Sequence, residues 1–250
     1  MKVAALWRYP VKSLQGERVD AVAVTPQGVV GDRHFGILDP ASGTILSAKR
    51  DGRLLAARAM LAGTELTISL PTGETALGLG AGVDAALSNW LGRAVHLIEA
   101  TPGGRGTYEI PVDFEDDDSP LVTFDGPPGS FVDGNPVHLL TTASLRAMEG
   151  IGPGLQWDAR RFRPNVVIDV GGEGFVEDAW VGGSVTVGDV VLDVYEACTR
   201  CVMTTRAQPG GLDRQLDVLR TINRDRARTF GVYARPQGDG DLRVGDEARA

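Results

Sequence analysis

The sequence predicts a mainly β protein with a few helices, an α+β fold made of two domains. Short segments of alternating or β-branched residues recur along the chain, as at Leu66, Ile68 and Leu70, which have polar residues between them. Gly and Pro are frequent and stand between these segments, where turns are needed. Only a few segments carry apolar residues at helical spacing. In the first part of the chain these patterns favour a β-barrel or sandwich architecture.

The first domain, residues 1–100, is expected to be β-barrel-like. Its predicted strands lie at 3–7, 19–24, 35–38, 66–70 and 95–98. A helix is predicted over 83–91, because its apolar residues recur at helical spacing and Gly92 suits a helix end. Residues 101–136 are rich in Gly, Pro and acidic residues and predict a long loop, in which Glu115 to Asp118 form a solvated acidic surface.

The second domain, residues 101–250, contains that loop and a predicted barrel at 137–250. An apolar run at 137–140 precedes a helix that Thr141 or Thr142 would cap. The continuous apolar run at 166–170 is typical of a strand buried on both faces. Further predicted elements are a type II′ hairpin at Gly188-Asp189, a helix through Leu212, Leu216 and Leu219, and a last hairpin of 230–234 with 242–244.

The composition restricts the classes of partner. The 250 residues, 42% of them hydrophobic, are enough to bury a sizeable core. A net charge of −8 excludes the basic surface that binds nucleic acid or an anionic membrane, so an anionic ligand would need a local cluster of Arg and Lys. No apolar run approaches the roughly 18 residues of a membrane span, and the first residues do not read as a signal peptide. We therefore expect a cytoplasmic protein.

Both cysteines lie in the segment Cys198-Thr199-Arg200-Cys201. Such thiols can be nucleophiles, a redox dithiol, metal ligands or simply buried structural groups. A thioredoxin-like dithiol would start a helix, whereas these cysteines follow a hairpin and residues 202–205 look extended. A structural zinc site needs about four N or S ligands, and the three histidines are not at zinc-finger spacing.

A third interpretation is a single thiolate that binds a metal in an organic cofactor. A guanidinium group can donate two parallel hydrogen bonds to two oxygens of one phosphate. Lys adds positive charge, and Ser adds a hydroxyl donor. Candidates for these roles are Lys12, Ser13, Arg33 and Arg163. The turn Asp133-Gly134-Asn135-Pro136 could direct backbone N–H groups at an anion. Whether these residues gather around one thiol is left open by the sequence pattern.

Seven short motifs occur in a fixed order. They are Tyr9-Pro10-Val11-Lys12-Ser13, Gly31-Asp32-Arg33, Arg161-Phe162-Arg163-Pro164-Asn165, Glu177-Asp178-Ala179-Trp180, Ala197-Cys198-Thr199-Arg200-Cys201 with Thr204-Thr205, Phe230-Gly231-Val232-Tyr233, and Arg243-Val244-Gly245-Asp246. This set resembles the family of MOSC domains preceded by an N-terminal β-barrel domain. That arrangement is found in the C-terminal region of molybdenum cofactor sulfurase and in the mitochondrial amidoxime-reducing component with its bacterial relatives. The resemblance covers nearly the whole chain.

The resemblance implies a molybdenum cofactor, a molybdopterin whose dithiolene holds molybdenum. It places the protein's thiolate ligand, and the catalytic role, at Cys201, with Cys198 a structural or tuning neighbour. It implies that the remaining cofactor-binding residues are Lys12, Ser13, Arg33, Asp133, Gly134, Asn135, Arg163, Thr199, Arg200 and Tyr233. Family annotation also associates MOSC domains with pyridoxal phosphate, but no Lys here lies in a motif for a Schiff base.

The implied activity is the reduction of small N-hydroxylated or N-oxygenated substrates. Electrons would come from a separate protein of the ferredoxin or flavin type, because the chain lacks the four cysteines of a plant-type iron–sulfur motif. The chain departs from the family after Thr204-Thr205, where the family has an apolar residue, an acid and Pro and this chain has Arg206-Ala207-Gln208-Pro209. This departure bears on substrate preference. The alternatives are a carrier that hands on the cofactor or a persulfide on Cys201, and an inactive binding protein.

Overall fold

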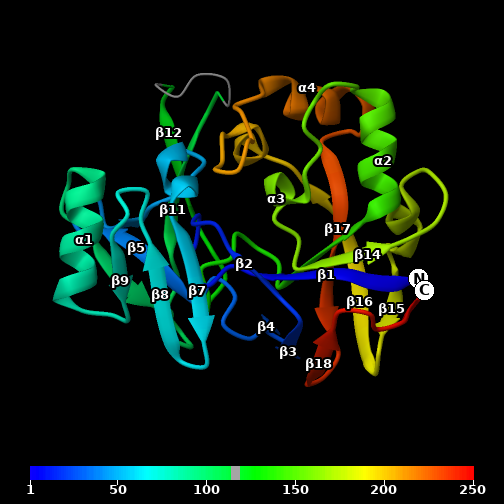
Figure 1. Cartoon of the computed structure of the whole chain (residues 1–250), viewed down its shortest axis with the longest axis horizontal. Helices are drawn as coiled ribbons and strands as arrows, with labels where there is room; N and C mark the ends of the chain where they lie inside the picture. The colour runs from blue at the N-terminus through cyan, green and yellow to red at the C-terminus, as the bar shows by residue number, and fades with distance from the viewer. Residues whose placement is uncertain (114–118) are drawn as a thin grey trace. The chain divides into compact units, whose positions relative to one another are not determined.

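The computed structural model of the chain describes residues 1–113 and 119–250 (Figure 1). The predicted acidic surface at Glu115 to Asp118 therefore lies outside the described residues. Strands dominate and four α-helices accompany them over the described ranges, in agreement with the predicted mainly β, α+β class. The chain forms two compact units, both discontinuous in sequence. Unit 1 contains residues 1–8, 18–30 and 135–250, and unit 2 contains residues 9–17 and 31–134.

Unit 1 is built on an eight-stranded sheet with the order β19-β15-β16-β17-β13-β14-β1-β2. The strands are β1 (Lys2–Arg8), β2 (Glu17–Val19), β13 (Val137–Thr141), β14 (Val166–Asp169), β15 (Gly183–Val187), β16 (Val190–Thr199), β17 (Thr229–Pro236) and β19 (Ala248–Arg249). A second sheet joins β18 (Gly240–Arg243), β3 (Ala21–Thr25) and β4 (Gly28–Val29). Inward-facing aliphatic residues of both sheets form one apolar cluster, which is the main core of this unit.

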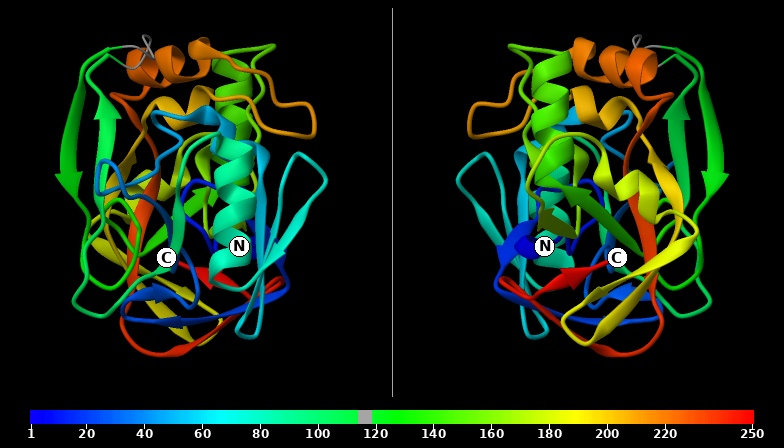
Figure 2. Two further views of the ribbon diagram at one scale, coloured as in Figure 1. Left: turned by 90° about the vertical axis from the view of Figure 1, so that its left-hand side faces the viewer. Right: turned by 90° about the vertical axis from the view of Figure 1, so that its right-hand side faces the viewer.

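Both chain termini belong to unit 1. Strand β1 pairs with β14 in antiparallel register, and the backbone N–H of Ala248 donates to the carbonyl of Met1 at 2.9 Å. The two ends overlap in the view of Figure 1, and the side views of Figure 2 show them separated within this unit. Strand β1, from the first eight residues, therefore belongs to a sheet whose other strands come mostly from the second half of the chain.

Three helices and two short 3₁₀ turns accompany the sheet of unit 1. They are α2 (Thr142–Ile151), α3 (Ala159–Phe162), α4 (Leu216–Asp225), η2 (Val176–Trp180) and η3 (Val202–Thr205). Helices α2 and α4 contribute Met148, Val218 and Ile222 to a second apolar cluster that includes Phe162 and Phe230. These helices bury one face in this cluster, and α4 also packs against η3.

The start of α2 is fixed by a buried carboxylate. Thr141 is the N-cap, as predicted, and its side chain accepts from the N–H of Ser144. Glu177 in η2 is fully buried and accepts from the Thr141 hydroxyl at 2.6 Å and the Ser144 hydroxyl at 2.7 Å. A buried carboxylate is tolerated when its oxygens are hydrogen-bonded, so Glu177 links η2 to this helix start.

Unit 2 contains two smaller sheets. The five-stranded sheet has the order β10-β5-β6-β11-β12, with β5 (Phe35–Asp39), β6 (Thr44–Ile45), β10 (His96–Glu99), β11 (Thr107–Pro111) and β12 (Leu121–Asp125). The three-stranded sheet joins β7 (Arg58–Ala62), β8 (Glu65–Ser69) and β9 (Thr75–Leu77). The helical elements are α1 (Ala81–Leu91) and η1 (Gly52–Ala56). Tyr108 and Phe131 are buried against Ile45 in a core cluster.

Several predicted elements are confirmed and others are wrong. Helix α1 ends at Gly92 in the left-handed conformation, as predicted, and β15 and β16 form the predicted hairpin with positive φ at Gly188. The long loop predicted at 101–136 is wrong in part, because β11 and β12 lie within it as an antiparallel pair. Their aromatic and aliphatic residues are flanked closely by Gly, Pro and acid, which obscured two short strands.

Three further predictions near the C-terminus need correction. The last hairpin is wrong, since β18 pairs with β3. Both edges of β17 are already occupied by β13 and β16, so no position beside it is open. The helix predicted from Leu212 begins only at Leu216. Residues 202–205 are not extended but form η3.

Gly231 shapes the strand that carries Tyr233. Its φ is +79°, a conformation that side chains with a Cβ rarely adopt. A Cβ at this position would lie 2.3 Å from Nε2 of His138 and 2.7 Å from the carbonyl oxygen of Leu139. Only glycine therefore lets β17 lie against β13 here.

Candidate functional site

The two cysteines differ in accessibility although only two residues lie between them. Strand β16 ends at Thr199, and Cys198 is fully buried just before that end. Cys201 follows in the N-cap position of η3 and is partly exposed. Both thiols are free. The strand end thus leaves one thiol partly exposed and keeps the other buried.

Arg200 stands between the cysteines and is buried. Its Nη1 donates to Sγ of Cys198 at 2.6 Å and its Nη2 donates to the carbonyl of Phe162 at 2.7 Å. Its Nε–H is buried and has no hydrogen-bond partner among the described residues. A buried N–H without an acceptor is costly, so this donor is suited to an oxygen or nitrogen acceptor of a ligand. This orphaned donor fits a polar cofactor bound beside the cysteines.

Electrostatics around Arg200 favour a charged guanidinium and a protonated Cys198. Burial opposes the Arg200 charge, but the neighbouring Cys198, Tyr233 and Cys201 raise its pKa overall. Burial raises the pKa of the Cys198 thiol, although Arg200 and a hydrogen bond to Tyr233 act in the opposite direction. Cys198 is therefore suited to a structural role, which leaves Cys201 as the candidate ligand.

Three other predicted residues lie at the same strand end of unit 1. Arg163 is the C-cap of α3 with φ 54°, and the carbonyl of the preceding residue is the one that Arg200 binds. Thr199 is exposed and pairs with Thr229. Tyr233 in β17 lies opposite Glu196 of β16, and its ring centroid is 5.8 Å from that of His138. The structure thus brings Arg163, Thr199, Arg200, Cys201 and Tyr233 into one neighbourhood.

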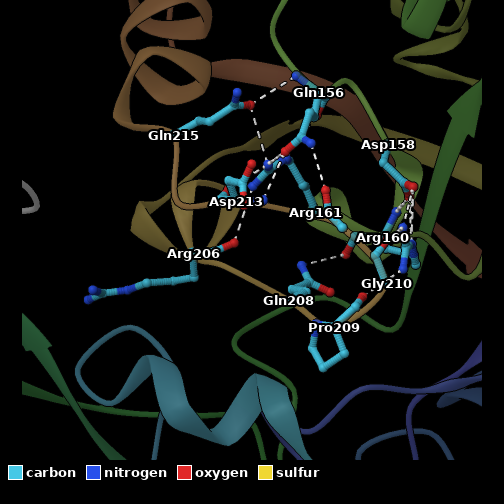
Figure 3. Close-up of polar contacts among 11 residues, drawn as sticks. Gln156, Asp158, Arg160, Arg161, Arg206, Gln208, Pro209, Gly210, Asp213 and Gln215 are labelled. Atoms are coloured by element: carbon cyan, nitrogen blue, oxygen red, sulfur yellow. Dashed lines mark hydrogen bonds and ion pairs between the residues drawn. The ribbon is translucent and has the colours of Figure 1, made fainter.

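A pair of adjacent arginines secures the loop that follows the cysteines (Figure 3). Arg161 is 1% exposed, and its guanidinium donates to the carbonyls of Thr204, Arg206 and Asp213. Arg160 pairs with Asp158 and donates to the carbonyls of Pro209 and Gly210. Arg161 belongs to one of the seven motifs, but this role was not predicted, because these three carbonyls lie more than 40 residues away in sequence.

The other predicted basic residues belong to unit 2, where Lys12 is the most enclosed. Its Nζ donates to the carbonyl of Phe131 at 2.8 Å and to Oδ1 of Asp133 at 2.7 Å, and it lies 3.8 Å from the centroid of the Tyr108 ring. Lys49 also contacts Asp133, at 3.1 Å from Oδ2. The sequence analysis missed Lys49, because no motif or spacing connects it with Lys12.

Ser13 and Arg33 lie in the same unit in left-handed backbone conformations, with φ of 67° and 46°. The Ser13 hydroxyl oxygen accepts from the N–H of Ala48 at 3.0 Å. Arg33 pairs with Asp32 and lies over the ring of Tyr9. Burial opposes the charge of Arg33, but Asp32, Tyr9 and Asp133 raise its pKa overall.

The predicted anion turn is divided between the two units. Asp133 and Gly134 belong to unit 2, whereas Asn135 belongs to unit 1. Asn135 donates through Nδ2 to Glu196 at 2.8 Å and accepts from the Tyr195 hydroxyl at 2.6 Å. Asp133 acts through its carboxylate, which pairs with Lys12 and Lys49. Its role in this structure is therefore that of a counter-ion.

The pKa of Lys12 gives a testable dependence of stability on pH. Burial lowers it from 10.5 to about 8, and Lys49 and Arg33 add to the effect while Asp133 opposes it. Between about pH 8 and 10.5 the unfolded chain holds this proton and the folded chain does not, so the Lys12 contribution to stability rises with pH. We expect the free energy of unfolding of the wild type relative to Lys12→Met to rise by roughly 2–3 kcal/mol across this range.

Urea denaturation of both proteins at pH 7.5 and pH 10 measures this difference. Titrations of all other groups occur in both proteins and cancel to first order. A difference that stays constant or falls as pH rises would contradict an enclosed Lys12 with a lowered pKa.

Residues 1–113 and 119–250 hold no group of three or more His, Cys, Asp or Glu side chains arranged to bind a metal ion. No helix in the same ranges is long and apolar enough to cross a membrane.

Comparison with known proteins identifies the family. Residues 1–90 match the family model described as "MOSC N-terminal beta barrel domain", and residues 127–249 match that described as "MOSC domain". This chain is a member of the MOSC family. The MOSC match covers β13 to β19 of unit 1, including both cysteines, and the N-terminal match includes Lys12, Ser13, Arg33 and Lys49.

The MOSC protein is similar along its length to named enzyme components. It is 28% identical over 290 residues to "Mitochondrial amidoxime-reducing component 1" of Mus musculus, which covers 98% of this chain and 80% of the relative. The human protein of the same name is 26% identical and covers 98% of this chain and 81% of the relative. Among solved structures, the YuaD protein from Bacillus subtilis aligns over 99% of this chain and 93% of its own, with a TM-score of 0.50 and 10% identity. That likeness concerns the fold.

Proposed function

We propose that this MOSC protein binds a molybdenum cofactor and reduces amidoximes or related N-hydroxylated small molecules, with Cys201 as the thiolate ligand of molybdenum. The observation that carries the proposal is the contrast at the end of β16. Cys201 is partly exposed, Cys198 is buried, and the Nε–H of Arg200 beside them is buried without a partner. The names of the full-length relatives support the reaction class.

The proposed roles follow from residue chemistry. The side chains of Lys12, Ser13, Arg33 and Arg163 are of the kinds that would neutralise and hydrogen-bond the cofactor's phosphate and pterin. Thr199, Arg200 and Tyr233 would orient the cofactor beside Cys201, with Gly134 and Asn135 contributing from the turn. Arg200 offers the best-defined of these contacts, because its Nη atoms are already engaged and only Nε–H is available.

The reaction would consume two electrons and two protons. The N–O bond of the amidoxime breaks, and the products are the amidine and water. The bound cofactor would supply the two-electron redox chemistry. The protein would bind and orient the cofactor and set the electrostatics around it. The electrons would come from a separate electron-transfer protein. The segment Arg206-Ala207-Gln208-Pro209 is held by Arg160 and Arg161 and begins at the end of η3, whose N-cap is Cys201. It is the proposed determinant of substrate preference.

The test is metal and pterin content followed by turnover. Protein from a molybdate-supplied host is expected to contain about one molybdenum per chain and to release a fluorescent pterin on oxidation. It should then convert an aryl amidoxime into the amidine with reduced methyl viologen as donor. Absence of molybdenum and pterin would refute the proposal. Stoichiometric cofactor without turnover of N-hydroxylated substrates would favour the carrier function.

A further inference from the structure

Both Nη atoms of Arg200 are engaged within the protein, and its Nε–H is not. Nη1 donates to Sγ of Cys198 at 2.6 Å, and Nη2 donates to the carbonyl of Phe162 at 2.7 Å. The Nε atom is buried and has no hydrogen-bond partner among the described residues. The whole residue is 9% exposed. The guanidinium is therefore held at its far end, with one buried donor left for a ligand.

The planarity of the guanidinium gives that donor a fixed direction. All five N–H groups of an arginine lie in one rigid plane, so holding Nη1 and Nη2 on two acceptors also sets where the Nε–H points. The main chain is held as well, because the N–H of Arg200 donates to the carbonyl of Arg228 at 2.8 Å and Thr199 pairs with Thr229. The Nε–H is thus oriented before any ligand binds.

The acceptor of Nη2 is fixed by the core of unit 1. The Phe162 ring packs edge-on against Phe230 at 4.6 Å between centroids and is stacked with Trp157 at 6.1 Å. Cζ of Arg200 lies 5.5 Å from the centroid of the same Phe162 ring. Because this acceptor is a backbone carbonyl, it does not depend on which side chain is present.

The acceptor of Nη1, in contrast, is a side chain. A fully buried cysteine usually acts as a small hydrophobic residue, for which packing requires no polar atom. The sulfur of Cys198 nevertheless accepts from Arg200 and hydrogen-bonds with Tyr233. Hydrogen bonds from a charged donor are among the stronger ones, and a buried donor that loses its acceptor is costly. The chemistry of residue 198, and not only its volume, therefore restrains the guanidinium.

We propose that Cys198 is a positioning residue, whose sulfur orients Arg200 so that the buried Nε–H donates to an acceptor atom of the bound cofactor. This inference rests on the proposed function, because the cofactor is the ligand expected beside Cys201. It gives the buried thiol a role that differs both from binding the metal and from filling the core. Without the sulfur, Nη1 has to find another acceptor and the Nε–H loses its direction.

Substitution by serine and by alanine separates positioning from packing. Serine keeps an acceptor at position 198, and alanine removes it. A residue that only fills buried apolar space should tolerate alanine at least as well as serine, because a buried hydroxyl is the less favourable of the two. Positioning predicts the opposite order, in which Cys198→Ser behaves like the wild type and Cys198→Ala does not.

The first measurement uses the full, molybdenum-free chain. Rotation about the Nε–Cζ bond exchanges the two Nη atoms, and ¹⁵N exchange spectroscopy measures its rate, with Arg200→Lys identifying the Arg200 signals. Rotation in Cys198→Ala should be faster than in the wild type by about tenfold or more, and that in Cys198→Ser should stay within about threefold. Arg161 is the internal control, because its Nη1 is held by the carbonyls of Thr204 and Arg206 and not by Cys198.

The second measurement is retention of the cofactor by protein from a molybdate-supplied host. The pterin that stays bound during dialysis is oxidised and measured by its fluorescence. Cys198→Ala should lose pterin about tenfold faster than the wild type, because a disoriented Nε–H no longer meets its acceptor. Cys198→Ser should lose it at the rate of the wild type. Neither measurement depends on turnover.

Each outcome supports or overturns the inference. Faster rotation and faster pterin loss in Cys198→Ala, with both restored in Cys198→Ser, support it. Unchanged rotation in Cys198→Ala, faster rotation without faster pterin loss, or equal effects of serine and alanine overturn it. If Cys198→Ala does not fold, as judged by circular dichroism, the isosteric pair Cys198→Thr and Cys198→Val makes the same comparison. Wild type without pterin would instead refute the proposed function, whereas the rotation rates test the Cys198 contact without any cofactor.

Discussion

Cys201→Ser is expected to abolish amidoxime reduction, whereas Cys198→Ser is expected to retain it. Loss of an outer partner of a metal ligand costs about 10-fold to 100-fold in activity, so loss of the ligand itself should exceed 100-fold. Serine is a poor substitute because its hydroxyl stays protonated at neutral pH and its oxygen is a harder ligand than sulfur. The buried serine at position 198 would still accept a hydrogen bond from Arg200. Both substitutions change the size of the side chain equally little, so a difference in activity between the two variants reports which sulfur binds molybdenum.

X-ray absorption at the molybdenum edge and turnover of an aryl amidoxime measure the two effects. We expect one fewer sulfur neighbour of molybdenum in Cys201→Ser and an unchanged number in Cys198→Ser. Both variants must accumulate as folded protein for the comparison, which circular dichroism checks. The reverse pattern, with sulfur lost only in Cys198→Ser, would assign the ligand to the buried thiol and contradict the contrast on which the function is proposed.

Arg161→Met is expected to lower the free energy of unfolding by about 4–6 kcal/mol, or to prevent folding. The Arg161 guanidinium is buried and serves the carbonyls of Gln156, Thr204, Arg206 and Asp213. Methionine fills much of the same space but donates to none of them. The buried carbonyls of Thr204 and Arg206 each cost about 1–3 kcal/mol when left without a partner, and the part-buried bonds to Gln156 and Asp213 add smaller losses. Burial also lowers the pKa of Arg161, and Asp158 and Asp213 only partly oppose this. Arg161 therefore stabilises the fold through its hydrogen bonds to these carbonyls.

The neighbouring Arg160 is the matched control. It is partly exposed, pairs with Asp158 and reaches the carbonyls of Pro209 and Gly210 at the surface (Figure 3). Arg160→Met should cost only about 1 kcal/mol, because water replaces exposed hydrogen bonds. Urea denaturation of both variants, with Arg161→Lys as a partial rescue, measures the difference. Equal and small losses for Arg160→Met and Arg161→Met would show that Arg161 does not hold the loop.

Local pattern was sufficient to predict much of the fold. Alternating and β-branched residues identified most strands, and Gly92, Thr141 and Gly188 marked a helix end, a helix start and a hairpin correctly. These signals work because a cap or a turn needs only a few neighbouring residues. The pairing of β18 with β3 was not predicted, because it depends on which sheet edges other strands have already occupied.

For the candidate site too, short motifs could be predicted from the sequence, whereas the contacts between distant residues could not. Motifs singled out Lys12, Arg33, Arg163, Arg200 and Cys201 without any structure. The partners of those residues came from elsewhere in the chain. Lys49 shares a carboxylate with Lys12 across 37 residues, and Arg200 binds the carbonyl of Phe162 across 38 residues.

The sequence by itself determined the family, the mainly β class and the thiol pair, because these depend on residue type and short-range spacing. Only the tertiary structure decided which thiol is buried, which N–H of Arg200 has no acceptor and which carboxylate holds the two lysines. Burial and charge pairing depend on contacts between distant segments, and these exist only once the chain has folded.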